Sequence, residues 1–394
     1  MDDISLPDDH VLLNFPPRLR KNIKEIWKDG KIGISSKSMK VHVNPTKASD
    51  DYSVIYKDNF ILEIPYAGRA LYWEVMFKDE DYGYPPDFDF PNDSFLFDPD
   101  IDTISAHMPS LANWNINNSK SLISVIRELM VLYKKYQISR LQTDNKYSAL
   151  YTEYQYLISE TNDAENIEVY IDNGGTVHFF ICINISFSDL PPYVQPMLIG
   201  KADNVLNPNE DTATLRVALK PDSSKVQSDL QLSPRLEQVI GSASTLHIPT
   251  FNKDSNNLLD YISQITTLLE ERVEQISNNY KLKNEYISFI ISVCGCNIIE
   301  YDSTLFSKVV LLCEVNNFYT LVLIQIGNKF PQEKPKVTLR SIYHLQHDKP
   351  FVHNLDNYPY SPRWTPEEMV KRLITNLKEE IPNFQVICQK LAAS

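Results

Sequence analysis

Two different spacings of apolar residues run through the chain. In LYWEVMF (71–77) the large apolar side chains Leu71, Trp73, Val75 and Phe77 fall at every second position, which is the period of a half-buried β-strand. From Ser121 onward, apolar residues recur every three or four positions, so that one face of a helix carries them. The pattern therefore predicts a mixture of helices and antiparallel strands.

The first third of the chain arranges these elements in a definite order. A helix over 16–28 is predicted to open at two prolines and to end at Gly30. Strands are expected at 32–34, 39–43, 60–64, 71–77 and 87–90. The last two are separated by a corner at Tyr84, Pro85 and Pro86, because proline fixes φ and removes a ladder donor. A long loop containing Trp114 then leads to the helix that begins near Ser121.

The last third repeats that order. A helix over 284–293 is predicted to end at Gly295. Strands are expected at 297–301, 306–315, 318–326 and 336–343. After a loop with Trp364, the closing helix has Thr365 as its N-cap and Glu368 in position for a capping box.

The middle third fits the same scheme less closely. Its predicted elements are a helix over 147–157, strands at 177–187 and 214–219, and a helix over 258–276. We interpret the chain as three diverged copies of one α+β unit, each a four-stranded antiparallel meander flanked by helices. The predicted domains are 1–145, 146–280 and 281–394.

Charge and composition exclude several classes of function. The formal net charge of −13 argues against a general nucleic-acid binder, which needs clustered Lys and Arg. No apolar run approaches the length of a membrane span, and the first ten residues lack the features of a signal peptide. We therefore expect no direct contact with nucleic acid or membrane, and a cytoplasmic or nuclear location. The five cysteines form no Cys-x-x-Cys pair and are expected to be reduced.

Metal and cofactor chemistry is not supported by the spacing of the ligand-type residues. His344 and His347 lack the acidic residue of a metalloprotease motif. Cys294 and Cys296 lack a second pair of ligands, and the acidic run 98–102 lacks the glycine and glutamate of a calcium loop. No metal and no cofactor is therefore expected.

The order of elements resembles the ubiquitin-conjugating-enzyme fold and its RWD relatives. In that fold a Tyr-Pro…Pro-Pro corner joins the third and fourth strands, and Tyr84, Pro85 and Pro86 look like it, although the leading Tyr-Pro is replaced by DYG (81–83). The resemblance implies an α+β chain of tandem ubiquitin-conjugating-enzyme-variant (UEV/RWD-like) domains. The segments FILEIPYAG, YPPDFDF, LSPRLEQVIGSASTLHIP, EYDSTLF and NYPYSPRW, in this order, resemble the BRE (brain and reproductive organ-expressed) family over nearly the whole chain.

That resemblance implies a non-catalytic scaffold subunit shared by two deubiquitinase assemblies. One is the mainly cytoplasmic BRISC, and the other is the nuclear A complex of the breast-cancer-type-one protein, which implies a role in DNA damage and repair. The implied partners are a zinc-dependent deubiquitinase specific for lysine-63-linked chains, its inactive Abraxas-type (MPN) partner and a von Willebrand A-domain subunit. Ubiquitin itself is a further candidate partner.

Two alternatives stay open, an active ubiquitin-conjugating enzyme and a free-standing ubiquitin-binding module. A conjugating enzyme carries ubiquitin as a thioester on a cysteine in the loop after the proline corner. The first copy has no cysteine before Cys182, and Cys182 itself precedes Pro191 and Pro192. The last copy has none between Cys313 and Cys388. These positions favour the non-catalytic interpretation.

The candidate partner-binding residues lie just before the closing helix. They are Tyr358, Pro359, Tyr360, Pro362, Arg363 and Trp364. Prolines stiffen the loop, which reduces the entropy lost on binding, and Arg and Trp are enriched among the residues that anchor interfaces. For Trp364 a core plug is an equal alternative, whereas for Trp114 the plug is the favoured interpretation. By resemblance, variant domains of this fold bind short proline-containing peptides beside the sheet.

Overall fold

The computed structural model describes residues 9–35, 37–43, 59–78, 81–91, 94–96, 101–161, 164–192, 211–221, 226–252 and 257–393. These residues contain helices and three antiparallel sheets, so the α+β prediction is confirmed. The chain divides into two compact units. The first comprises the described parts of Met1–Ile185 and Ile199–Leu268, and the second comprises those of Ser186–Leu198 and Leu269–Ser394.

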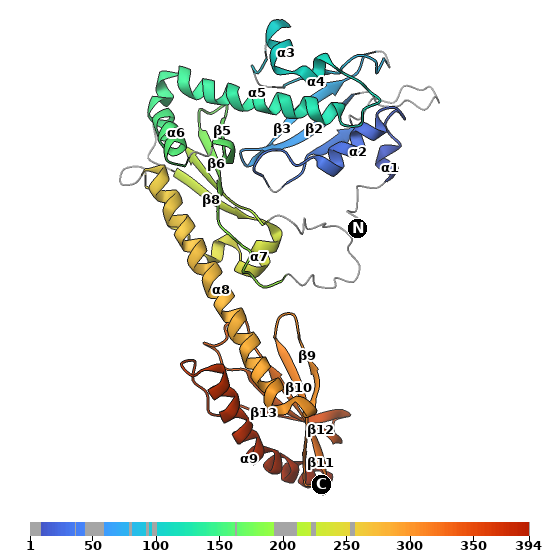
Figure 1. Ribbon diagram of the computed structural model, residues 1–394, viewed down its shortest axis with the longest axis vertical. Helices are drawn as coiled ribbons and strands as arrows, with labels where there is room; N and C mark the ends of the chain where they lie inside the picture. Colours follow the sequence, from blue (N-terminus) through green and yellow to red (C-terminus); the bar gives the residue numbers. More distant parts are fainter. Residues whose placement is uncertain are drawn as a thin grey trace. The chain divides into compact units, whose positions relative to one another are not determined.

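The first sheet has the order β1-β2-β3-β4 (Figure 1). Its strands are β1 (Lys40–Val43), β2 (Asn59–Tyr66), β3 (Arg69–Met76) and β4 (Asp87–Asp89). Ala67 and Gly68 both have positive φ (48° and 73°), which is the conformation of a two-residue turn that matches the twist of a hairpin. The predicted strand at 32–34 does not form, because these residues belong to the bend that leads from α2 to β1.

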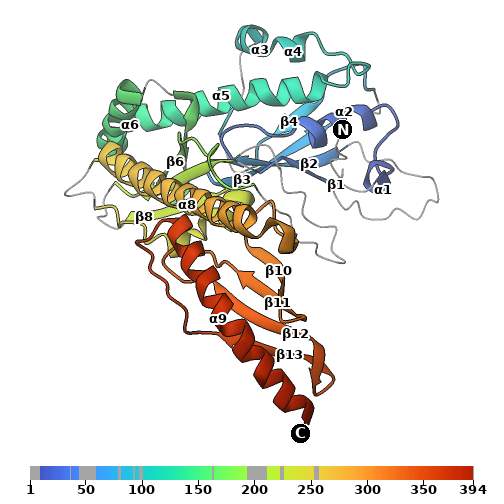
Figure 2. The ribbon, with the colours of Figure 1, turned by 60° about the horizontal axis from the view of Figure 1, so that its bottom comes forward.

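The helices of this part are α1 (Asp9–Leu12), α2 (Arg20–Asp29), α3 (Ile101–His107), α4 (Pro109–Ala112) and α5 (Ser121–Thr143). The prediction that α2 opens at its two prolines is wrong, because Leu19 is the residue at the N-cap and Pro16 and Pro17 precede it. The helix predicted near Ser121 is α5, which lies along the first sheet in both views (Figure 1 and Figure 2). The short helices α3 and α4 occupy what the sequence presented as a long loop.

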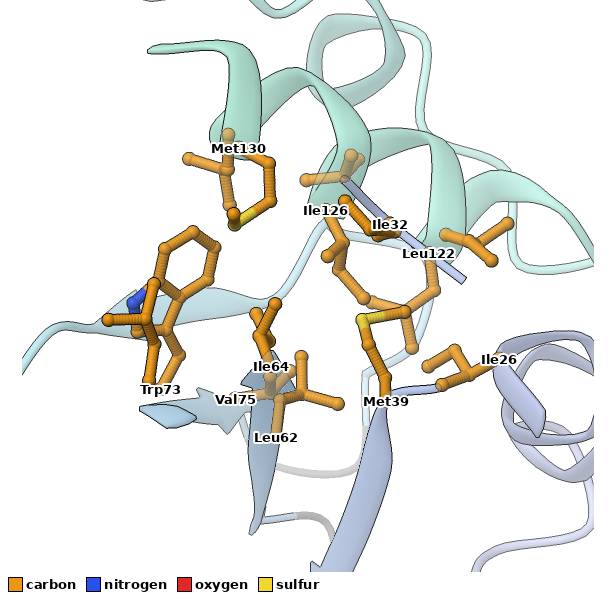
Figure 3. Close-up of a cluster of buried hydrophobic side chains, with 14 of the residues drawn as sticks. Ile26, Ile32, Met39, Leu62, Ile64, Trp73, Val75, Leu122, Ile126 and Met130 are labelled. Carbon is orange, nitrogen blue, oxygen red and sulfur yellow. The ribbon is translucent and has the colours of Figure 1, made fainter. Parts of the chain in front are cut away.

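The core of this part lies between the sheet and helices α2 and α5 (Figure 3). Leu62 and Ile64 of β2 and Val75 of β3 point toward Ile126 of α5, and all four are fully buried. Burying one such side chain stabilises the fold by roughly 1.5–3 kcal/mol. The apolar residues that alternate along the strands and those that recur every three or four positions along α5 therefore pack together in one core layer.

The second sheet has the order β5-β6-β7-β8. Its strands are β5 (Ile167–Ile171), β6 (Val177–Ile183), β7 (Ala213–Leu219) and β8 (Val226–Leu232), and its helices are α6 (Ser148–Thr161) and α7 (Pro234–Ile240). β6 and β7 were predicted, although β6 ends four residues earlier than expected. Two strands of this sheet were not predicted, β5 and β8, and the residues of β8, VQSDLQL, are mostly polar.

A buried carboxylate joins the two sheets of the first unit. Glu168 of β5 is 3% exposed, and its Oε1 accepts a hydrogen bond from Ile34 N (3.1 Å) while its Oε2 accepts one from Ala67 N (2.7 Å). Tyr66 donates its hydroxyl to the carbonyl of Val169 at 3.0 Å. Burial raises the pKa of Glu168, while the two N–H donors oppose that shift. Hydrogen bonds between a side chain of one sheet and the backbone of the other part thus hold the two sheets together.

Helix α8 (Leu258–Cys294) belongs to both compact units. The prediction of two helices, over 258–276 and 284–293, is wrong because the segment between them continues the same helix. No glycine or proline occurs in 258–294, so nothing in the backbone chemistry interrupts it. The expected domain limit at 280 and 281 therefore falls inside α8.

The sheet of the second unit has five strands rather than the four expected, in the order β13-β12-β11-β10-β9. They are β9 (Ile298–Tyr301), β10 (Lys308–Val315), β11 (Phe318–Gln325), β12 (Lys336–Gln346) and β13 (Lys349–Leu355), and the closing helix is α9 (Pro366–Ala393). The missed strand β13 pairs with β12 through a turn at His347 and Asp348, both with positive φ. Figure 2 shows α9 running along this sheet.

We expect Glu168→Ala to lower the free energy of unfolding by about 2–4 kcal/mol, because the N–H groups of Ile34 and Ala67 lose their acceptor. Urea denaturation of the full chain measures the change. Glu165→Ala is the matched control, since Glu165 is exposed three residues away and should change the free energy by less than about 0.5 kcal/mol. Equal effects of the two substitutions would contradict the bridging role of Glu168.

Candidate partner-binding site

The candidate loop lies between β13 and α9, and two of its tyrosines tie it to the segment that precedes β12. Tyr358 is buried and donates its hydroxyl to the carbonyl of Pro335. Tyr360 donates to the carbonyl of Pro331 at 2.5 Å. Burial raises the pKa of Tyr360 to about 12, and burial together with the charge of Tyr360 raises the pKa of Tyr358 further. Both hydroxyls therefore remain protonated donors at neutral pH, and both tyrosines hold the loop in place.

The other predicted residues lie at the surface of the loop. Pro359, Pro362 and Arg363 are exposed, and Arg363 makes no side-chain hydrogen bond or ion pair within the described residues. Trp364 is half-buried and packs against the core of the second unit. We call Pro359, Pro362 and Arg363 the exposed loop residues. Of the six candidates, these three are exposed, whereas Tyr360 and Trp364 are half-buried and Tyr358 is buried.

One face of Trp364 is covered by a cation that the sequence analysis did not select. The guanidinium carbon of Arg372 lies 4.2 Å from the centroid of the Trp364 ring, and its Nε donates to Glu368 Oε1 at 2.8 Å. Such a cation–π contact is worth about 0.5–1 kcal/mol at an exposed site. The signal in the sequence was the i, i+4 pair of Glu368 and Arg372 on the first turns of α9.

The first turn of α9 forms half of the expected capping box. The N–H of Glu368 donates to the Thr365 hydroxyl at 3.3 Å. The Glu368 side chain does not reach back to the cap, because it is engaged by Arg372. The end of the exposed loop is therefore fixed by one capping hydrogen bond and one ion pair.

Tyr84, Pro85 and Pro86 lie between β3 and β4, and Pro86 directly precedes β4. Tyr84 is 70% exposed, whereas Pro86 is buried. Trp114 is half-buried near this corner, where its Nε1 donates to the carbonyl of Tyr82 at 3.1 Å and its ring lies 6.0 Å from that of Phe77. These contacts give Trp114 the role of a plug between the loop and the sheet.

Three of the described cysteines, Cys294, Cys313 and Cys388, have thiols with a raised pKa. Burial raises the pKa of Cys294 and Cys388, and burial together with the charge of Cys294 raises that of Cys313 to about 11.

Residues 9–393, outside the gaps given above, contain no group of three or more His, Cys, Asp and Glu side chains that could hold a metal ion. None of the helices in that part of the chain is long and apolar enough to cross a lipid bilayer.

We expect iodoacetamide at pH 8 to label Cys296 well before Cys313. Cys296 is exposed, whereas a pKa of about 11 leaves only about one in a thousand Cys313 thiols ionised at that pH. Peptide mass spectrometry of the native chain over a time course measures both rates. The urea-unfolded chain is the control, in which the two rates should converge; fast labelling of Cys313 in the native chain would contradict the burial argument.

Comparison with known proteins places this architecture in a family. The family model of brain and reproductive organ-expressed protein (BRE) matches residues 14–345. A relative from Danio rerio, "BRISC and BRCA1-A complex member 2", is 32% identical over 392 residues, which is 97% of this chain and 97% of the relative. A relative of the same name from Branchiostoma floridae is 32% identical over 390 residues, which is 96% of this chain and 97% of the relative. The similarity therefore covers both compact units.

Proposed function

This chain belongs to the BRE family, and from that premise we propose that it is a non-catalytic scaffold subunit of a deubiquitinase complex specific for lysine-63-linked ubiquitin chains. The observation that carries the proposal is the similarity to "BRISC and BRCA1-A complex member 2" over 97% of both chains. The similarity extends over both compact units, so the proposal applies to the whole chain.

The proposed partners are those that the family resemblance implies. They are a zinc-dependent deubiquitinase subunit, an inactive Abraxas-type subunit and a von Willebrand A-domain subunit, with ubiquitin as a further candidate. Membership of both BRISC and the BRCA1-A complex corresponds to a presence in the cytoplasm and the nucleus and to a part in DNA repair. The chain would connect these subunits rather than act on ubiquitin.

The absence of catalysis is supported by the environment of the thiols. A ubiquitin-conjugating enzyme needs a reactive thiolate after the proline corner. Between the corner at Pro85 and Pro86 and the end of α5 there is no cysteine at all. Cys313 lies in β10, ahead of the loop that leads to α9, and burial raises the pKa of its thiol. The chain is therefore proposed to leave cleavage to its metalloprotease partner.

We also propose that the three sheets are three UEV/RWD-like domains, with limits near 1–145, 146–280 and 281–394. Each sheet is an antiparallel meander in which neighbouring strands follow one another in the chain. In the first sheet the proline corner lies between β3 and β4, as the resemblance requires. Helix α8 would then serve the second and third domains together.

The exposed loop residues are proposed to anchor one of the partners. The hydrogen bonds of Tyr358 and Tyr360 fix the loop. Little conformational entropy is therefore lost when a partner covers Pro359, Pro362 and Arg363. Arg363 offers a guanidinium that has no partner among the described residues. A carboxylate on the partner would pair with it at a partly desolvated site.

We expect the chain, when co-expressed with the three proposed partner subunits, to co-elute with them in size-exclusion chromatography. Arg363→Ala should weaken the capture of one partner by about tenfold or more, because an arginine that acts as an interface hot spot contributes about 1.4 kcal/mol or more. The matched control is Lys390→Ala, which removes an exposed cation from α9 of the same unit and should leave capture unchanged.

The two parts of that prediction fail separately. If the wild-type chain does not co-elute with any of the three subunits, the scaffold function is rejected. If it co-elutes and Arg363→Ala does so equally well, the loop is not the anchor although the scaffold function stands. Melting curves of both variants should match the wild type, since neither side chain is buried.

We expect no ubiquitin thioester on the purified chain after incubation with activating enzyme, ATP and ubiquitin, and no cleavage of lysine-63-linked chains. No thioester is expected because no cysteine lies between the first proline corner and the end of α5, and because the pKa of the Cys313 thiol is raised. No cleavage is expected because the described residues contain no group of three or more His, Cys, Asp and Glu side chains that could hold a metal ion. Non-reducing gels measure both reactions, with an active conjugating enzyme as the positive control. A band that disappears on reduction would establish the conjugating-enzyme alternative instead.

A further inference from the structure

A groove of about 1000 Å³ lies within the first unit, between its two sheets. One wall is formed by residues 37–40 and by 68–70 at the β2–β3 turn. The other is formed by 229–234, at the end of β8, and by 242–244. Ligand pockets in proteins have volumes of roughly 300–1,000 Å³, so this groove has room for a segment of polypeptide.

The groove follows the backbone edge of β8 rather than one of its faces. Successive side chains of a strand point to opposite faces, yet all six residues from 229 to 234 line the groove. β8 is also the last strand in the order of its sheet. An edge strand has a row of backbone groups without ladder partners, which is a template for another strand.

The hydrogen-bond pattern identifies which backbone groups point into the groove. Ser233 N donates to Thr212 O at 2.9 Å, and Leu232 pairs in register with Ala213. In an antiparallel ladder, hydrogen-bonded and non-hydrogen-bonded pairs alternate, so the residues at 233, 231 and 229 bond to β7. Leu230 and Leu232 therefore turn their N–H and C=O groups outward, and no hydrogen bond engages those groups within the described residues.

The charges around the groove select the chemistry of the added chain. Lys31, Lys37, Lys40 and Arg69 line the groove on the side of the first sheet, where Glu63 is the acidic residue and pairs with Lys40 at 3.4 Å, while Asp229 and Glu237 line the side of β8. The whole chain, by contrast, has 38 basic and 51 acidic residues. This wall is therefore locally basic on an acidic protein, and carboxylate side chains on the added chain would be attracted to it.

We propose that the outer edge of β8 binds an extended, acidic peptide segment of a partner protein by strand addition. The peptide pairs its backbone with the N–H and C=O groups of Leu230 and Leu232. Its glutamate or aspartate side chains face Lys37 and Lys40. Main-chain hydrogen bonds provide the affinity in this mode of recognition, and the side chains provide the selectivity.

The test uses the full-length chain and a fluorescent, acetylated peptide of alternating valine and glutamate, followed by anisotropy. The proposal requires saturable binding of this peptide, and binding weaker by at least about tenfold for the same peptide with lysine in place of glutamate. It also requires slower amide hydrogen exchange across 226–232 when the peptide is bound. Failure to bind at millimolar concentration, or equal binding of the two peptides, would overturn it.

Backbone pairing is tested on both molecules. N-methylation of the peptide amides in one alternating set should abolish binding, while methylation of the other set should not, because only one set faces β8. On the protein, Leu232→Pro removes an outward N–H and leaves the bonds to β7, whereas Leu232→Ala keeps that N–H. Binding should fall at least about tenfold more for Leu232→Pro than for Leu232→Ala.

Two controls keep the result decisive. Lys37→Glu should weaken binding of the acidic peptide, and Lys24→Glu, an exposed site on α2 that does not line the groove, should not. If Leu232→Pro does not fold, the N-methylated peptides decide the matter alone. Equal tolerance of both methylated sets, or a concentration-dependent dimer that forms through β8 and excludes the peptide, would overturn strand addition by a partner.

Discussion

The arrangement of the first unit depends on the hydrogen bonds of one buried carboxylate. Glu168 lies in the second sheet. It accepts hydrogen bonds from two N–H groups, one in the segment after α2 and one in the β2–β3 turn. Gly33 has a φ of +76°, and a Cβ at that position would come within 2.2 Å of Glu168 Oε1, so only glycine lets the backbone approach the carboxylate. A shift of the carboxylate would leave both N–H groups unsatisfied inside the protein. The relation of the two sheets is therefore set by hydrogen-bond geometry as well as by apolar packing.

A second polar cluster continues this junction toward the surface. His178 lies between Asp172 and two arginines, with its Nε2 3.0 Å from Arg69 and 3.2 Å from Asp172. Burial lowers the pKa of His178, and the hydrogen bond to Asp172 opposes that change. Because Arg69 also lines the groove beside β8, the junction of the two sheets and the proposed peptide site share a wall.

The second unit uses the same kind of local chemistry for a different purpose. Tyr358 and Tyr360 donate hydrogen bonds to the carbonyls of Pro335 and Pro331. These bonds fix a loop with two exposed prolines, although the loop itself is not buried. Arg372 covers one face of Trp364 and leaves Arg363 beside it at the surface. The two proposed binding regions thus have distinct characters, an edge strand in the first unit and a stiff loop in the second. A scaffold that joins several subunits needs separate surfaces of this kind.

The sequence by itself determined the elements whose signal is local, and the tertiary structure decided those whose partners are distant. Alternating apolar residues predicted β3 and β6, the spacing after Ser121 predicted α5, and the quoted motifs identified the family. The polar strand β8 and the added strand β13 carried no such pattern, because an edge strand is stabilised by a neighbour's backbone rather than by its own apolar face. The roles of Tyr358 and Glu168 likewise depended on carbonyl and N–H groups that lie 23 and 101–134 residues away. Periodicity reports the burial of a side chain, but it does not report which distant backbone group will meet it.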